Sequence, residues 1–372
     1  MDYEEKAIEL FGKSSYSAFE IEDKWNKNNK LKGYISKKAT ELYGALFITH
    51  VNNIEVPQLI YGTPKMHYPF DKQDRYNFPA AKTILVYEKL DGTNILAFTY
   101  TDGVQDFLSF KTRLTPTVSD GRWGNFENMW KEMLDKYPNI TSLVRETGNN
   151  ISFELFGARN RHLIQYNIPL DIKVLFAISK NGKIIPPSIF NTYDIPVVIL
   201  EDEISSDYEK NYKYHQEQMQ LKLKEGEDST YIGQEGQVWY LNTVEGKWIQ
   251  FKCKPETIES IHFANGGLSK NSILTTCINA FENYDDIDYE KIKSLLLEDF
   301  QEKDIEAKYY LIVSCIQEIK TQLAFKERVL GLYNKIGKDI NLYKNEIMRE
   351  LSQWFLKKDM KKVYTIIINT LK

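Results

Sequence analysis

Two short lysine-containing segments have residue types that could carry chemistry, Lys89-Leu90-Asp91-Gly92 and Lys252-Cys253-Lys254. A lysine amine is nucleophilic only when it is neutral. Its ordinary pKa is about 10.4, so a neighbouring positive charge or burial must lower that pKa. Alternate residues of a strand share one face, which places Lys252 and Lys254 together. If that face looks toward Lys89, two cations and a divalent metal ion would lower the pKa of Lys89 and bind a triphosphate. The segments therefore fit a lysine that attacks an α-phosphate.

Further residues suited to this chemistry follow in order along the chain. Glu154 and Glu235 are carboxylates that suit metal or ribose binding, and the forked guanidinium of Arg113 suits a phosphate group. Glu154 lies on an apolar strand, where a carboxylate needs a partner. Plainer interpretations remain open. The first tetrapeptide is also typical of a β-turn, Phe176 of a core residue, and the lysine pair of a solvated hairpin edge.

The elements that must position these residues are mainly strands. Short β-branched and aromatic runs, separated by Asp91-Gly92 and Asp102-Gly103, predict three strands between residues 82 and 113, arranged as a meander. Apolar spacing predicts helices at 125–136, within 202–229 and near 17–25. Further strands are predicted at 151–157, 171–179, 197–200, 237–242 and 247–254. The last two form a hairpin whose turn lies near Glu245-Gly246.

The distribution of proline divides the chain. All eleven prolines lie at or before Pro255, and residues 256–372 show apolar positions at intervals of three and four with few helix breakers. This pattern predicts a helical C-terminal domain over 256–372. A chain of 372 residues is long enough for two domains, each with a core of its own.

Composition excludes several classes of protein. A net charge of -4 excludes nucleic-acid binding through bulk charge alone but permits a local basic groove. No apolar run reaches the roughly 20 residues of a membrane span, and the N-terminal residues lack the pattern of a signal peptide, so we expect a soluble cytoplasmic protein without membrane partners. Three widely spaced cysteines argue against a disulfide framework and a structural zinc site.

Taken together and in order, these segments resemble the covalent nucleotidyltransferases, the superfamily of ATP-dependent polynucleotide ligases and capping enzymes. The quoted segments are Lys89-Leu90-Asp91-Gly92, Lys111-Thr112-Arg113, Phe153 to Gly157, Val174 to Ala177, Glu235 to Val238 and Lys252 to Lys254. The resemblance implies an α+β fold. An antiparallel-sheet nucleotidyltransferase domain, of the ATP-grasp-like ligase kind, would occupy residues 1–255, followed by the all-helical domain at 256–372.

The resemblance also implies roles for individual residues. Lys89 would become covalently joined to AMP, with Lys252 and Lys254 as further catalytic lysines. Glu235 would hold Mg²⁺ or Mn²⁺, and Glu154 would contact the ribose and also serve as a metal ligand. The remaining residues expected to bind ATP are Glu88, Leu90, Asp91, Gly92, Asn94, Lys65, Arg113, which would orient a phosphate, and Phe176, which would stack on adenine.

The helical continuation after Lys254 is similar to that of RNA ligases of the phage T4 RNA ligase 1 type. The stretch Ala158-Arg159-Asn160-Arg161 supports that similarity, whereas Lys89 to Asn94 looks as much like the second RNA ligase group. The resemblance implies sealing of RNA 5'-phosphate and 3'-hydroxyl ends through lysyl-AMP and RNA-adenylate intermediates, with cleaved transfer RNA as one candidate substrate. The alternatives are a DNA ligase, a capping-type guanylyltransferase, or a non-catalytic RNA-binding protein.

Basic residues outnumber acidic ones in the C-terminal stretch from Lys335 onward. Nine lysines and arginines stand there against four aspartates and glutamates. Such a surface could contact RNA phosphates, with a salt-sensitive contribution to affinity, and the helical domain is a candidate RNA-specificity module. A solvated helix face is the equal alternative. The sequence defines no oligomeric state.

Overall fold

The computed structural model describes residues 2–13, 15–27, 29–38, 40–71, 75–118, 125–160, 162–226, 230–262, 268, 270–284, 286–297, 300 and 302–371. Contacts divide the chain into two compact units, with the change between Ser260 and Ile261. Helix α5 (Glu256–His262) contains this change. The division into domains after Pro255 stays a prediction.

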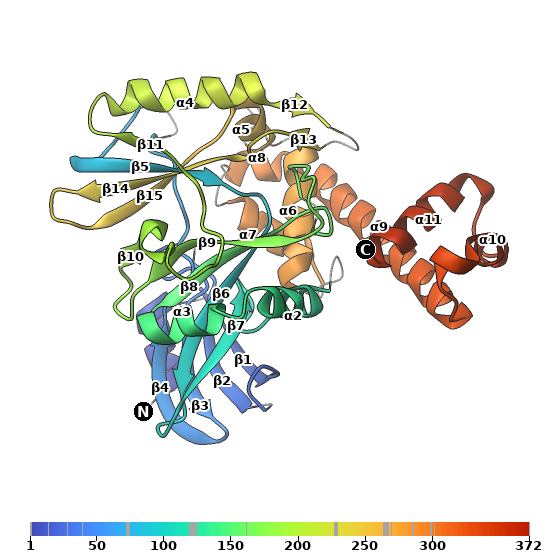
Figure 1. Ribbon diagram of the computed structural model, residues 1–372, viewed down its shortest axis with the longest axis horizontal. Coiled ribbons are helices and arrows are strands. Elements are labelled where there is room, and N and C mark those ends of the chain that lie inside the picture. The colour runs from blue at the N-terminus through green and yellow to red at the C-terminus, as the bar shows by residue number, and fades with distance from the viewer. Residues whose placement is uncertain are drawn as a thin grey trace. The chain divides into compact units, whose positions relative to one another are not determined.

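Three antiparallel sheets form most of the first unit (Figure 1). The first sheet has the order β1 (Tyr16–Asp23), β2 (Asn29–Ser36), β3 (Leu46–Val51), β4 (Ile54–Ile60). The second has the order β10 (Ile184–Ile185), β9 (Asp171–Ile178), β8 (Asn150–Phe156), β6 (Thr93–Thr101), β7 (Asp106–Thr112). The third has the order β11 (Leu200–Ile204), β5 (Ala81–Lys89), β14 (Gly236–Thr243), β15 (Trp248–Cys253).

Short elements complete the first unit. A two-stranded ribbon pairs β12 (Lys224–Glu225) with β13 (Tyr231–Ile232). The helices are α1 (Tyr3–Phe11), α2 (Phe126–Lys136), α3 (Ile140–Thr147), the 3-10 turn η1 (Pro187–Phe190) and α4 (Tyr208–Lys222). Helix α2 begins where the Asn125 side chain accepts a hydrogen bond from the Asn128 amide, a standard N-terminal cap.

The second and third sheets pack face to face through a buried apolar layer. Tyr87 and Tyr240 of the third sheet contribute to this layer together with Phe156 and Phe176 of the second. The outer face of the third sheet is covered by α4, through Tyr212 and Met219 (Figure 1). The outer face of the second sheet is covered by α2 and α3. This packing fixes the second and third sheets, and the residues at the ends of their strands, relative to each other.

The second unit is helical in its described part. It contains α6 (Lys270–Asn283), α7 (Tyr289–Leu296), α8 (Glu302–Glu306), α9 (Tyr309–Ile336), α10 (Ile340–Leu351), the 3-10 turn η2 (Lys357–Asp359) and α11 (Met360–Leu371). The long helix α9 contributes to two cores. Its first half packs with α6, α7 and α8, and its second half packs with α10 and α11. The prediction of a helical C-terminal region is thus confirmed.

Two expected elements are wrong, and the strand expected at 197–200 lies further along the chain, as β11 at Leu200–Ile204. Most of residues 17–25, up to Asp23, belong to an edge strand, β1, rather than a helix, because Tyr16–Asp23 pair along their whole length with β2. The three strands between residues 82 and 113 do not form a meander. β5 pairs with β14 and β11, whereas β6 pairs with β7 and β8. The chain therefore crosses from one sheet to another at Leu90 to Gly92. The hairpin of β14 and β15, the helix α2 and the α4 helix within 202–229 are confirmed.

Candidate active site

Three strands of the third sheet bring their ends together at one edge. Lys89, the last residue of β5, lies opposite Gly236, the first residue of β14, and Gln237 lies opposite Cys253 at the end of β15. Glu235 directly precedes β14 and Lys254 directly follows β15. A side chain at Gly236 would place its Cβ 2.4 Å from the Cys253 carbonyl oxygen, so glycine is required for this close pairing. The register alone therefore gathers Lys89, Glu235 and Lys254.

The three side chains form a buried ion triad. Lys89 Nζ pairs with Glu235 Oε2, and Lys254 Nζ lies 2.6 Å from Glu235 Oε1. The Lys89 side chain is 18% exposed, whereas those of Glu235 and Lys254 are 6% and 7% exposed. The proposed nucleophile is thus the member of the triad that solvent reaches best.

The electrostatics of Lys89 differ from the expectation. Burial alone would lower the pKa of Lys89, but the charges of Glu235, Glu154 and Asp91 outweigh it and raise that pKa. Burial would likewise raise the pKa of Glu235, and the neighbouring Lys254 and Lys89 instead hold it far below its ordinary value. In this structure, Lys89 is therefore a protonated member of an ion pair rather than a neutral amine.

Glu154 enters the site from the second sheet. It lies on the central strand β8, opposite Asn94 of β6, and its side chain is buried. Burial raises the pKa of the Glu154 carboxyl to about 7, although Lys89 and Arg113 act to lower it. Arg113 follows β7, and its buried Nε has no hydrogen-bond partner among the described residues. Glu154 thus titrates near neutral pH beside a guanidinium with an unused donor.

The loop from Lys89 to Gly92 is fixed by hydrogen bonds where it crosses between sheets. Asp91 Oδ2 accepts from the amides of Leu163 and Ile164 at 2.6 and 2.7 Å, and the Asp91 amide donates to the Tyr166 hydroxyl at 2.8 Å. A Cβ at Gly92 would lie 2.2 Å from the Leu155 carbonyl oxygen. In this structure, Asp91 and Gly92 therefore hold the lysine in place.

Other predicted site residues have clear structural partners. Glu88 pairs with Lys173 and accepts from the Ile199 amide at 2.8 Å. Asn94 is buried and donates to Ser152 Oγ at 2.8 Å. Leu90 belongs to the apolar layer between the sheets. These contacts support the walls of the site, and direct roles in ATP binding stay predictions.

The remaining predicted residues are not members of the ion triad. The Lys252 ammonium lies over the Tyr68 ring, 4.3 Å from its centroid, rather than in the Glu235 ion pair. Phe176 is 2% exposed within the layer between the sheets, so its stacking on adenine stays a prediction. Lys65 is half-buried, and its amide donates to the Thr40 carbonyl. Arg161 lies outside the described residues.

Two carboxylates of the site, Glu154 and Glu235, are candidates to hold a metal ion. Among the described residues, no group of three or more His, Cys, Asp and Glu side chains forms a metal site. Mg²⁺ keeps several waters and is commonly bound through one or two carboxylates together with substrate phosphates. Glu154 and Glu235 supply two carboxylates, and Glu235 is engaged by two ammonium groups. The pair therefore fits a metal that arrives with a nucleotide.

Two residues that the sequence interpretation did not select also belong to the site. His162 Nε2 lies 3.3 Å from Thr93 Oγ1, and its charge acts on Asp91 and Glu154. Tyr166 anchors the Asp91 amide. Both follow Asn160, whose side-chain amide donates to the Leu155 carbonyl at 2.7 Å. A single histidine has no spacing pattern, so only the position of His162 close to Asn160 in the sequence could have indicated that it belongs to the site.

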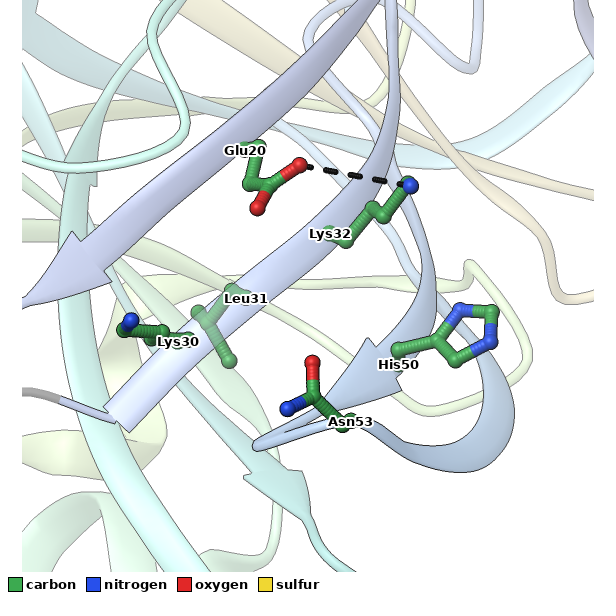
Figure 2. A pocket seen from close by; sticks show the side chains of 6 residues that line it. All are labelled: Glu20, Lys30, Leu31, Lys32, His50 and Asn53. Atoms are coloured by element: carbon green, nitrogen blue, oxygen red, sulfur yellow. Dashed lines mark ion pairs between the residues drawn. The ribbon is translucent and has the colours of Figure 1, made fainter.

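A surface hollow lies away from this chemistry. Figure 2 shows it on the first sheet, where its lining includes Lys30, Lys32 and His50, and a wide ion pair joins Lys32 to Glu20 at 4.0 Å. None of its lining residues belongs to the ion triad. The candidate site is therefore the edge where β5, β14 and β15 end.

Among the described residues, no helix is both long and apolar enough to cross a membrane.

Comparison with known proteins gives only distant similarities. Neither a protein-family model nor a curated protein sequence matches the chain. Two forms of an archaeal ATP-dependent RNA ligase align with 94% of this chain and 86% of theirs, at 13% and 12% identity with TM-scores of 0.48 and 0.44. A putative ATP-dependent DNA ligase from Aquifex aeolicus aligns over 94% of this chain and 79% of its own, at 13% identity with a TM-score of 0.42.

A shorter alignment links the chain to an RNA ligase from Naegleria gruberi with PPi. It covers 50% of this chain and 53% of the other, at 14% identity with a TM-score of 0.34. Similarities at these scores and identities do not show the function of this chain. Membership of the phage T4 RNA ligase 1 type stays a prediction.

Proposed function

We propose that this protein is an ATP-dependent RNA ligase that joins 5'-phosphate and 3'-hydroxyl RNA ends. The observation that carries the proposal is the meeting of Lys89, Glu235 and Lys254 at one sheet edge, with Glu154 close enough to influence the pKa of Lys89. A lysine reached by solvent, a second fixed cation and two carboxylates are the groups that nucleotidyl transfer to a lysine requires.

In the first step, the Lys89 amine attacks the α-phosphorus of ATP. A phosphorus–nitrogen bond forms, the bond to the bridging oxygen breaks, and pyrophosphate leaves. Mg²⁺ or Mn²⁺ held by Glu235 and Glu154 would neutralise charge on the phosphate oxygens. Lys89 gives up two protons to solvent, the one that its pairing with Glu235 retains before the attack and one more as the phosphorus–nitrogen bond forms. Lys254 keeps a positive charge beside the attacked phosphate, where charge develops during transfer.

In the later steps, AMP passes from Lys89 to the RNA 5'-phosphate, and a 3'-hydroxyl then displaces AMP to form a phosphodiester. Arg113 suits a phosphate in these steps because its buried Nε has no partner among the described residues. The choice of RNA as the acceptor rests on the sequence resemblance, including the stretch Ala158 to Arg161 and the helical continuation. Cleaved transfer RNA in the cytoplasm is one candidate substrate.

A sealing assay tests the choice of nucleotide and acceptor. Nicked duplexes, broken stem-loops and single strands, each made of RNA or DNA, are incubated with the protein, a divalent metal and ATP or GTP. The proposal expects ATP-dependent sealing of RNA ends. Preferential sealing of DNA would indicate a DNA ligase, and covalent labelling by GTP alone would indicate a capping-type enzyme. Either result would contradict the proposal.

A further inference from the structure

The corner between α10 and α11 exposes two large apolar side chains. Trp354 is 56% exposed and Leu356 is 63% exposed, while Phe355 between them is buried in the core of α9, α10 and α11. The Phe355 ring packs edge-on against Phe325, with 5.3 Å between their centroids. Phe355 therefore anchors the corner in the core, while Trp354 and Leu356 on either side of it are exposed to solvent.

Arg328 of α9 holds the backbone of this corner in place. Its Nη2 donates to the Trp354 carbonyl oxygen at 3.2 Å, and its guanidinium carbon lies 5.2 Å from the Phe355 ring centroid. A ligand that stacks on Trp354 would thus meet an aromatic ring carried by an already ordered segment. Ordering that segment would cost such a ligand little binding energy.

Three lysines that lack carboxylate partners follow Trp354 closely in the chain. Lys357, Lys358 and Lys361 are exposed, and within the described part of the chain none of them forms an ion pair. Asp359 is the acidic residue between Lys357 and Lys361. Other lysines of the same unit do pair with carboxylates, namely Lys270, Lys293, Lys320 and Lys338. The three lysines therefore leave a local positive charge at the corner, which Asp359 offsets only in part.

The position of these lysines is also unfavourable for the helix. The first turn of α11 contains no acidic residue, and η2, which leads directly into it, carries Lys357 and Lys358 against one acid, Asp359. A helix N-terminus favours negative charge and disfavours cations. By contrast, α1 and α7 carry glutamates in their first turns. An external anion would relieve both the mutual repulsion of the lysines and this conflict with the helix.

We propose that this corner binds single-stranded RNA, with a base stacked on Trp354 and phosphates at Lys357, Lys358 and Lys361. Single strands combine a polyanionic backbone with open base faces, which is the chemistry that an exposed tryptophan beside unpaired lysines recognises. A duplex hides its base faces and could not stack on the tryptophan. This inference deepens the proposed function, on which the identity of the RNA as substrate rests.

The test measures the affinity of the full chain for a short fluorescent 5'-phosphorylated oligouridylate by anisotropy over a range of salt concentrations. Trp354→Ala should weaken binding by about 5- to 100-fold, the usual effect of removing the ring under one stacked base. Joint replacement of Lys357, Lys358 and Lys361 by Gln should flatten the salt dependence, by about 0.7 in log–log slope for each phosphate that the lysines no longer neutralise.

Matched controls come from α4 and the residues that follow it. Tyr214 has the same exposed fraction as Trp354, 56%, so Tyr214→Ala removes an equally exposed ring. Joint replacement of Lys210, Lys222 and Lys224 by Gln removes the same charge from exposed positions. Binding by these control variants should match that of the unmodified chain. Circular dichroism of each variant verifies that the helices remain folded.

Two results would overturn the inference. One is RNA affinity in the α10–α11 variants that falls no further than in the α4 controls. The other is unchanged RNA affinity together with abolished binding to phosphatidylserine vesicles, which would assign the corner to a lipid surface. The proposed function fails separately, because it predicts labelling of Lys89 by ATP in the unmodified chain and in all four variants.

Discussion

The ion pair between Lys89 and Glu235 sets the protonation state of the proposed nucleophile. Glu235 is the strongest of the charges that raise the pKa of Lys89, while burial acts in the opposite direction. Glu235→Gln should therefore lower that pKa, because burial and the nearby Lys254 ammonium remain. Modification of Lys89 by an amine-reactive reagent, followed across pH by peptide mass spectrometry, should then begin at lower pH. Lys82 on the same strand is the internal control. Unchanged modification of Lys89 would contradict the assigned pairing.

Glu154 gives a second prediction about pH. Its pKa of about 7 lies above the ordinary value of 4.5, so the folded state binds more protons than the unfolded state between these values. The contribution of Glu154 to stability therefore falls as pH rises from about 4.5 to about 7. Glu154→Gln should be more stable than the unmodified chain at pH 8, by up to about 3 kcal/mol, and similar at pH 4.

Denaturant unfolding at the two pH values measures this difference. Glu245→Gln, in the exposed turn between β14 and β15, serves as the control and should leave the pH dependence of stability unchanged. A stability difference for Glu154→Gln that is equal at pH 4 and pH 8 would show that Glu154 does not titrate as assigned.

The sequence could predict which residues meet but not how their charges balance. Lys89, Glu235 and Lys254 were selected from spacing and residue type, and the structure brings them together. The pairing of Lys89 with Glu235 joins residues 146 positions apart, so no local pattern indicates it. We expected cations to lower the pKa of Lys89. The charges of Glu235, Glu154 and Asp91 raise it instead, and the sequence does not show that these carboxylates lie near Lys89.

At the scale of elements, the crossing between two sheets positions Lys89. Gly92→Ala would force a Cβ to within 2.2 Å of the Leu155 carbonyl oxygen and 3.0 Å of Phe156 Cβ. We expect a loss of about 1–3 kcal/mol in stability, typical of overpacking, and weaker labelling of Lys89 by ATP. Thermal unfolding and labelling yield measure the two effects.

Gly331→Ala is the matched control for this substitution. Gly331 lies within α9, and nothing would lie within 4 Å of the added Cβ. Alanine is favoured over glycine in a helix, so this variant should be more stable by about 0.5–1 kcal/mol. Equal stability and labelling of Gly92→Ala and the unmodified chain would contradict the close approach of Gly92 to Leu155 of β8.

Strand positions were predictable, but strand partners were not. The runs that form β5, β6 and β7 were located from composition, and the Asp91-Gly92 turn suggested that β5 and β6 are neighbours. They belong to different sheets because each finds its partners far along the chain, β14 for β5 and β8 for β6. The strand β1 was mistaken for a helix because its exposed edge position leaves little alternating apolar pattern.

At the scale of the whole molecule, the first unit contains every described member of the proposed site. Its cores are formed by its own sheets and by α2, α3 and α4. A fragment ending at His262, which retains α5 and its hydrogen bonds to Gln216 and Gln220, should therefore still be labelled on its lysine by ATP. It should seal RNA ends less well than the full chain.

Labelling and sealing by this fragment and by the full chain are compared at equal concentration. Loss of labelling in a fragment that unfolds cooperatively would contradict the independence of the first unit. Undiminished sealing would contradict a role of the helical unit in substrate binding. The net charge of -4 predicts neither outcome, because the cations that matter are local.

The most direct test of the central claim is incubation of the protein with α-labelled ATP and Mg²⁺, followed by mass spectrometry of its peptides. We predict one AMP on the peptide that contains Lys89, no labelling of Lys89→Ala, and full labelling of Lys82→Ala, which alters an exposed lysine on the same strand. Full labelling of Lys89→Ala, or AMP on a different residue of the unmodified chain, would contradict the account.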